Sequence, residues 1–186
     1  MKSKVFGRVL LLAGLFFSAT AMATPTPTPT PTQNDDVASL INQRLSYMKD
    51  VAGYKQNHHL AIEDLPQEAK VLANSVLEAE KLGLDSESVK PFIQAQMDAA
   101  KAIQYRYRAD WLSMPEKGWQ PEPLEQVRAK LSGLNTRILA DISSQLTKGR
   151  PFTDPTAFMN VLDQTQLKQG DKERLWYSLK QITLKK

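Results

Sequence analysis

Arg44 and Lys55 are two basic residues that the sequence directs toward the apolar side of one predicted helix, where they could bind an anion. Apolar residues recur every three or four positions between residues 37 and 56, which is the spacing of an amphipathic helix. At about 100° per residue, Lys55 lies within about 20° of Arg44 and roughly 16 Å further along the helix axis. Because an unpaired buried charge is costly, two inward cations require either carboxylate partners or an anionic ligand.

Gln104 and Arg137 add two hydrogen-bond donors on or beside the apolar stripes of later predicted helices. With Arg44 and Lys55 of the first helix, these residues predict a polar pocket that is formed by three helices and could bind an anion. Structural ion pairs with Asp64, Glu68 or Asp141 account for the same pattern equally well. The spacing alone therefore predicts the pocket and leaves its contents open.

Every element that is expected to position these residues is a helix. Apolar residues follow helical spacing, Gly is sparse outside turns, and no segment alternates apolar and polar residues as a strand does. The helices are predicted at about residues 37–56, 64–82, 86–112, 122–148, 154–166 and 171–184. We therefore predict an all-α, single-domain bundle of about six helices.

The N-terminal residues carry an export pattern. Residues 1–23 combine a basic start, an apolar run and the small-residue ending Ala21-Met22-Ala23, which is typical of a cleavable secretory signal peptide. Residues 24–33 contain a strict Thr-Pro alternation, which favours an extended linker. We expect the folded domain to span residues 34–186, and the mature protein to be periplasmic or secreted and free of the membrane.

The charge balance and the motifs argue against several classes of protein. Removing the signal, with Lys2, Lys4 and Arg8, reduces the 24 basic residues to 21 against 20 acidic ones, so we expect no nucleic-acid binding. The chain has no cysteine, and His58 and His59 are adjacent without further ligands at metal-binding spacing. Common hydrolase, nucleotide-binding and calcium-binding motifs are absent from the sequence. We therefore expect no metal site.

Four blocks of the sequence keep the order and spacing of a known family. They are Arg44-Leu45 followed by Lys55, Ile62-Glu63-Asp64, residues 102–111, and Leu134-Asn135-Thr136-Arg137. These blocks, spread over residues 37–146, resemble the secreted chorismate mutases of the all-helical class. The resemblance implies an isomerase that rearranges chorismate to prephenate, in the biosynthesis of phenylalanine and tyrosine, with no cofactor.

The resemblance also implies roles for the four donors. Chorismate carries two carboxylates, which Arg44 and Arg137 would grip so that the enolpyruvyl chain lies over the ring. Lys55 and Gln104 match the donors that stabilise negative charge on the ether oxygen as the C–O bond breaks.

Further positions are implied to contact the substrate. Asp64 and Glu68 match residues that contact the region of the ring hydroxyl. Gln67 stands where relatives often carry another arginine, and Ala100 stands where relatives carry a hydroxyl group, so the chain departs from the family pattern at both positions. Because Gln104 is an amide, it donates at any ordinary pH, and we expect activity to depend weakly on pH near neutrality.

Within the exported members, each pocket is built in a single chain, and a homodimer is implied. The alternative interpretation is a non-enzymatic exported helical module that binds a protein or a small anion through the same cationic pocket. Consumption of chorismate by the purified protein distinguishes the two.

Overall fold

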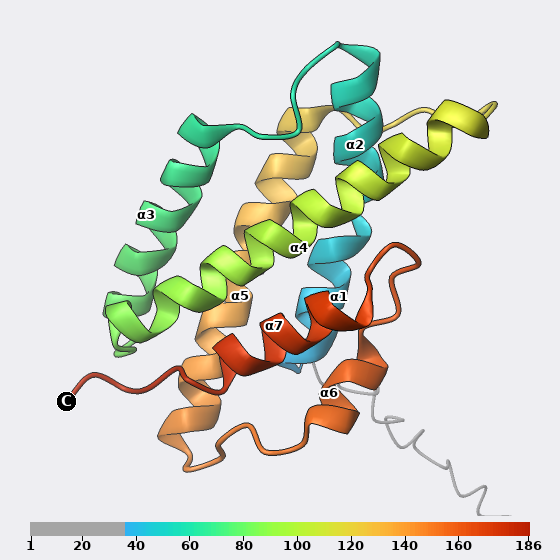
Figure 1. The fold of residues 1–186 in the computed structure, drawn as a ribbon. Coiled ribbons are helices and arrows are strands. Elements are labelled where there is room, and N and C mark those ends of the chain that lie inside the picture. The colour runs from blue at the N-terminus through green and yellow to red at the C-terminus, as the bar shows by residue number, and fades with distance from the viewer. Residues whose placement is uncertain (1–35) are drawn as a thin grey trace, which may run out of the picture. The chain divides into compact units, whose positions relative to one another are not determined.

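The computed structural model describes residues 36–186, and within this range the chain is helical (Figure 1). The helices are α1 Val37–Ser46, α2 Met48–Asn57, α3 Leu65–Lys81, α4 Ser86–Ser113, α5 Leu124–Thr147, α6 Pro155–Val161 and α7 Gln169–Leu179. None of these helices is long and apolar enough to cross a membrane. The predicted all-α class is confirmed, while the predicted signal peptide and linker lie outside the described residues.

The first predicted helix is interrupted once, at Tyr47, which brings the helices of the described region to seven instead of about six. The Tyr47 backbone stays in the right-handed helical region, at φ −74° and ψ −5°. Its carbonyl still accepts from the Val51 N–H at 3.1 Å. Because the chain continues through the break as a helix, Arg44 of α1 and Lys55 of α2 still reach one pocket.

The long helix α4 is the centre of the bundle. It packs against α2, α3 and α7, while α5 packs against α1, α2 and α3 (Figure 1). The short helix α6 packs on α1 and α7, so it joins the last part of the chain to the first helix. Fully buried side chains such as Ile41, Phe92, Ile103 and Ile138 fill the interior. Burial of these apolar surfaces fixes α1 to α5 around a shared space.

The connection between α4 and α5 is fixed against α2 at Gly53. Trp119 packs so closely there that a Cβ on Gly53 would lie 2.6 Å from a carbon of the indole ring. Trp111 lies against the same ring, with 5.9 Å between the ring centres, and the Lys49 ammonium lies 4.6 Å from its centre. Only a glycine permits this approach, which holds the connection over α2 two residues before Lys55.

Candidate active site

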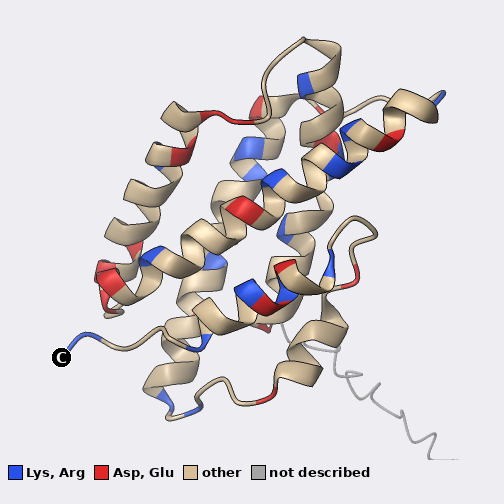
Figure 2. Ribbon diagram, viewed as in Figure 1, with Lys and Arg blue, Asp and Glu red and all other residues tan. Residues whose placement is uncertain are grey.

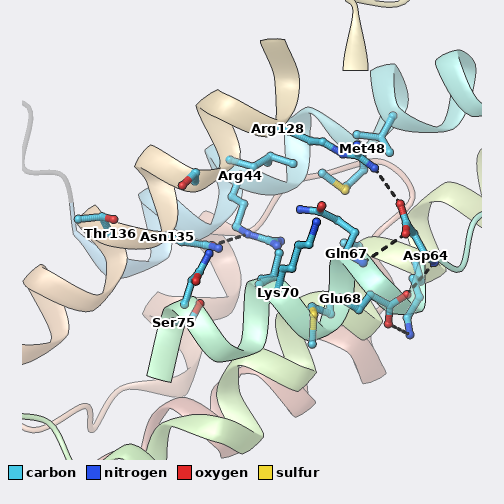
Figure 3. Close-up of a pocket in the computed structure, with 18 of the residues that line it drawn as sticks. Arg44, Met48, Asp64, Gln67, Glu68, Lys70, Ser75, Arg128, Asn135 and Thr136 are labelled. Atoms are coloured by element: carbon cyan, nitrogen blue, oxygen red, sulfur yellow. Dashed lines mark hydrogen bonds and ion pairs between the residues drawn. The ribbon is translucent and has the colours of Figure 1, made fainter. Parts of the chain in front are cut away.

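A cavity of about 480 Å³ lies between α1, α2, α3, α4 and α5 (Figure 3). A cavity of this size suits a small molecule. The charged residues that line it are Arg44, Lys55, Lys70, Lys81, Lys101, Arg128, Asp64, Glu68 and Glu78. Because basic residues outnumber acidic ones in the lining, the cavity favours a negatively charged ligand.

Arg44 enters the cavity from α1 as a buried cation, with 5% of its surface exposed. Its Nε donates to Asn135 Oδ1 of α5 at 2.9 Å, and Nη1 donates to the Gln96 carbonyl at 3.4 Å. No carboxylate within residues 36–186 forms an ion pair with it. Burial lowers the pKa of Arg44 to about 10, so the side chain stays protonated at neutral pH. Arg44 is therefore a fixed, desolvated positive charge.

Lys55 is the second buried cation, with 6% of its surface exposed. Its Nζ donates to the Ile62 carbonyl at 2.5 Å, and no described carboxylate forms an ion pair with it. Burial lowers the pKa of Lys55, and the nearby charge of Asp64 partly opposes this effect. An ammonium has three N–H donors, so two remain for a ligand. The burial of Arg44 and Lys55 agrees with the orientation that helical periodicity predicted.

Gln104 presents its amide from α4 and is 5% exposed. Its Nε2 donates to the Ala100 carbonyl at 3.1 Å and lies 3.7 Å from the Met48 sulfur, while its Oε1 is buried without a partner. A thioether is a weak acceptor, so one N–H of Gln104 is poorly satisfied. Ala100 lies in the cavity wall, one turn before Gln104.

Asp64 begins α3 and joins it to α5. It is the N-cap of α3, where its Oδ1 accepts from the Gln67 N–H at 3.3 Å. Its other carboxylate oxygen accepts from Arg128 Nη2 at 2.8 Å, and its own N–H donates to Glu68 Oε1 at 3.2 Å. The ion pair therefore positions Arg128 at the wall of the cavity. Gln67, one turn into α3, also lines the cavity.

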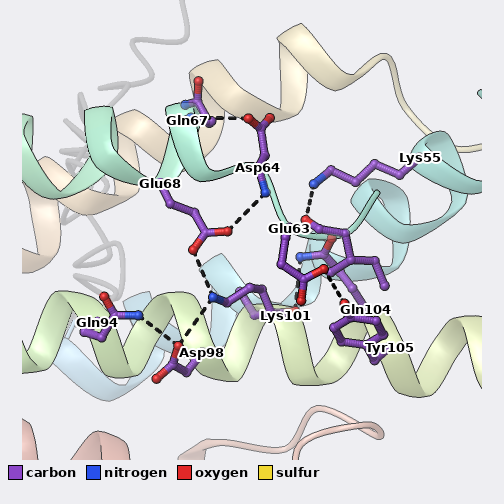
Figure 4. A network of polar contacts seen from close by, with 12 residues as sticks. Lys55, Glu63, Asp64, Gln67, Glu68, Gln94, Asp98, Lys101, Gln104 and Tyr105 are labelled. Carbon is purple, nitrogen blue, oxygen red and sulfur yellow. Dashed lines mark hydrogen bonds and ion pairs between the residues drawn. The ribbon is translucent and has the colours of Figure 1, made fainter. Parts of the chain in front are cut away.

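Glu68 belongs to a chain of polar contacts that runs from α3 across α4 (Figure 4). Lys101 of α4 bridges Glu68 at 2.9 Å and Asp98 at 3.6 Å, and the hydrogen bond to Glu68 is the main cause that raises the pKa of Lys101. Asp98 also pairs with Arg174 of α7 at 2.8 Å. The helix α4 carries both acidic and basic residues, so it supplies the cation of one contact and the carboxylate of the other (Figure 2). The network fixes Glu68 relative to α4.

Arg137 is the one expected site residue that the structure does not bring to the cavity. It is exposed on α5 and is absent from the cavity lining. The lining positions of α5 include Leu124, Arg128, Leu131 and Asn135, which recur every three or four residues along one face. Arg137 is about 200° around the helix from Asn135, so it projects from another face.

Arg128 is a lining residue that the sequence interpretation missed. It lies four residues after Leu124 and three before Leu131, so its helical register places it beside the apolar stripe. That signal was available in the sequence. It did not distinguish Arg128 from Arg137, because the two arginines flank the same stripe on opposite sides.

Comparison with known proteins agrees with this geometry. The sequence profile of the chorismate mutase type II family matches residues 32–105. A protein of Yersinia pestis named secreted chorismate mutase is 46% identical over 183 residues, covering 97% of this chain and 94% of that protein. The chain belongs to the chorismate mutase type II family. A monofunctional chorismate mutase of Enterobacter agglomerans is 43% identical over 147 residues, covering 78% of this chain and 81% of that protein.

Solved structures of the family share the fold. The crystal structure of the Yersinia pestis secreted chorismate mutase matches with a TM-score of 0.78 and 52% identity, covering 80% of this chain and 97% of that chain. The chorismate mutase of Burkholderia thailandensis matches with a TM-score of 0.63 at 24% identity, covering 77% and 94% of the two chains, which shows the fold alone. The resemblance that the sequence blocks indicated is therefore confirmed at the level of family and fold.

Proposed function

We propose that this protein is a secreted chorismate mutase, an isomerase that rearranges chorismate to prephenate. The observation that carries the proposal is the pair of buried cations, Arg44 and Lys55, which face one cavity without an ion-pair partner among residues 36–186. A dianionic substrate supplies the missing negative charge. Membership of the family favours this enzyme over a non-enzymatic module that binds an anion.

The first task of the site is to hold the substrate folded. In chorismate the enolpyruvyl side chain must lie over the ring before its terminal carbon can bond to the ring carbon. One C–C bond then forms as the C–O bond breaks, with six electrons moving in a cycle and no proton transferred. We assign the two carboxylates to Arg44 and Arg128, because both line the cavity, from α1 and α5 respectively. Binding both carboxylates holds chorismate in the folded conformer that the reaction requires, although that conformer is unfavourable in solution.

The second task is to stabilise charge that develops as the C–O bond breaks. Negative charge grows on the ether oxygen, and fixed donors in a dry site interact with it more strongly in the transition state than in the ground state. Lys55 has two unused donors, and Gln104 has one N–H directed at a weak acceptor, the Met48 sulfur. Exchanging that sulfur for the ether oxygen improves the hydrogen bond of Gln104.

The remaining residues of the site are assigned to the ring. Glu68 retains lone pairs beyond those used by Lys101 and the Asp64 N–H, so it can accept from the ring hydroxyl. Both backbone groups of Asp64 are engaged within α3, so we assign its carboxylate to the positioning of Arg128. Gln67 and Ala100 supply wall contacts, in place of the cation and the hydroxyl that the resemblance implied.

The proposed function is tested by adding purified protein to chorismate. We expect the absorbance of chorismate to fall with first-order dependence on enzyme, and NMR to identify prephenate as the only product. A rate no higher than that of the uncatalysed reaction would remove the proposal and favour the binding module.

The structure favours Arg128 of α5 as a substrate-binding residue, whereas the resemblance implied Arg137 of the same helix, and variants of the two residues distinguish these assignments. We expect Arg128→Met to lower kcat/KM by about 10- to 100-fold, because a charged hydrogen bond to a substrate carboxylate contributes about 1.5–3 kcal/mol. Arg137→Met, which changes an exposed residue of the same helix, is expected to leave kcat/KM within about threefold of the unchanged protein. Steady-state kinetics of both variants decides the assignment, and the reverse order of effects would restore Arg137 to the site.

The assignment of Gln104 as a hydrogen-bond donor predicts how kcat of a Gln104→Glu variant depends on pH. In Gln104→Glu the side chain donates only when protonated, and burial raises the pKa of a carboxyl group. We expect this variant to be most active at acidic pH and to lose kcat as pH rises through that pKa. The unchanged protein is expected to show little change over the same range. Parallel kcat profiles for the two proteins would contradict a donor role for Gln104.

Location and assembly follow from the same proposal. The name of the Yersinia pestis relative and the pattern of residues 1–23 support export with removal of the signal. We also propose a homodimer in solution. Because five helices of a single chain line the cavity, we expect activity per chain to be independent of protein concentration across the dissociation of that dimer.

A further inference from the structure

Six basic and three acidic residues line the cavity, and the acidic ones are all matched. Asp64 pairs with Arg128 at 2.8 Å, Glu68 with Lys101 at 2.9 Å, and Glu78 with Lys81 at 3.6 Å. Within residues 36–186, three lining cations then remain without an ion pair, and they are Arg44, Lys55 and Lys70. The first two are buried and already have roles. The third has none.

Lys70 differs from the buried cations in its position. It lies on α3, one turn after Gln67, where it is exposed and also lines the cavity. Its side chain forms no hydrogen bond or ion pair with any residue of the described region. Figure 3 shows Lys70 extending from α3 into the cavity that Arg44 enters from α1. A flexible four-carbon stem lets such an ammonium reach from solvent to a bound ligand.

We propose that Lys70 is a substrate-binding residue whose ammonium contacts a carboxylate of the dianionic substrate from the solvent side of the cavity. This inference rests on the proposed function. Among the other partly exposed lining cations, Arg128 is already assigned to one substrate carboxylate and also pairs with Asp64 and Glu125. Lys101 is bound to Glu68 and Asp98. Gln67, the lining residue one turn earlier, carries no charge. Lys70 is therefore the exposed lining cation that is available to neutralise the substrate.

The chemistry of a carboxylate predicts the kinetic signature. A substrate carboxylate keeps its full charge in the ground state and in the transition state, so a cation that binds it stabilises both states alike. Loss of such uniform binding raises KM and leaves kcat unchanged. Lys55 differs in this respect, because we assign it to an ether oxygen whose charge grows during the reaction.

Three variants test the proposal by steady-state kinetics on chorismate. Lys70→Met keeps the length of the stem and removes the charge, and we expect it to raise KM about tenfold with kcat within about twofold. Lys70→Arg restores the charge and is expected to recover most of that loss. Lys81→Met is the matched control, since Lys81 is an exposed lysine of the same helix that lines the same cavity but is paired with Glu78. We expect its KM to stay within about twofold of the unchanged protein.

Salt dependence gives a second readout. Because added salt screens an exposed charge, KM of the unchanged protein is expected to rise with NaCl concentration, and Lys70→Met is expected to lose much of that rise. An unchanged KM in Lys70→Met, or an equal rise of KM in Lys81→Met, would overturn the proposal. A fall of kcat at constant KM would overturn it as well. If the unchanged protein does not consume chorismate, the proposed function fails and this inference fails with it.

Discussion

Lys55→Ala is expected to lower kcat by about a hundred- to a thousandfold, which is the typical cost of removing one fixed donor to a developing oxyanion. Lys55 is buried at the cavity wall, so neither water nor an exposed lysine replaces it. The loss should fall on kcat more than on KM, because the ether oxygen gains charge only as the bond breaks. Steady-state kinetics on chorismate measures both constants.

The matched control for this variant is Lys49→Ala. Lys49 is on the same helix, α2, but it pairs with Glu116 at 2.6 Å and lies outside the cavity lining. We expect kcat of this control to remain within about twofold. Circular dichroism of both variants verifies the helical fold. Nearly full activity in folded Lys55→Ala would remove Lys55 from the site.

The pH dependence of activity in the unchanged protein depends on the protonation of the Lys55 ammonium. Lys55 acts as a donor in its protonated form, which is present below its pKa and is lost as pH rises through that pKa. Because burial lowers this pKa, kcat/KM should begin to fall at a lower alkaline pH than for an ordinary lysine. Bound substrate raises the pKa again, so kcat should fall at a higher pH than kcat/KM.

Arg44→Met is expected to abolish most activity and at the same time to stabilise the fold. The burial that lowers the pKa of Arg44 to about 10 corresponds to a cost of roughly 3 kcal/mol for holding the charge in the free protein. A methionine fills similar space without a charge, so we expect the free energy of unfolding to rise by about 1–3 kcal/mol. We expect kcat/KM to fall by at least about a hundredfold.

Urea denaturation and chorismate kinetics on the same preparations measure the two effects. Arg174→Met serves as the control, because Arg174 is an exposed arginine of α7 that pairs with Asp98 outside the cavity. Its effects on unfolding are expected to stay within about 0.5 kcal/mol. A marked loss of stability in Arg44→Met would show that the arginine serves the fold, and would weaken the argument that its counter-charge is the substrate.

Most of the fold could be predicted from the sequence, because helical elements are encoded by local spacing. The start of α3 at Asp64 is an example, since an N-cap side chain and an early proline are local signals. The break at Tyr47 could not be predicted. It has no proline or glycine to mark it, and the residues on both sides keep one apolar stripe.

The inward direction of Arg44 and Lys55 was determined by the sequence alone, because both lie within the apolar arc of their helix and that arc must face the interior. Their lack of ion-pair partners was decided only by the tertiary structure. Asp64 and Glu68 were possible partners by sequence, and the fold gives them to Arg128 and Lys101 instead.

Which arginine of α5 lines the cavity, Arg128 or Arg137, was also decided only by the tertiary structure. Helical periodicity determines the angle of each residue about its own helix axis, and it places these two arginines on opposite sides of the apolar stripe of α5. It does not determine which neighbouring helix lies on each side. Packing of α3 against α5 decided that the cavity lies on the side of Arg128, and this arrangement depends on contacts between residues far apart in the sequence.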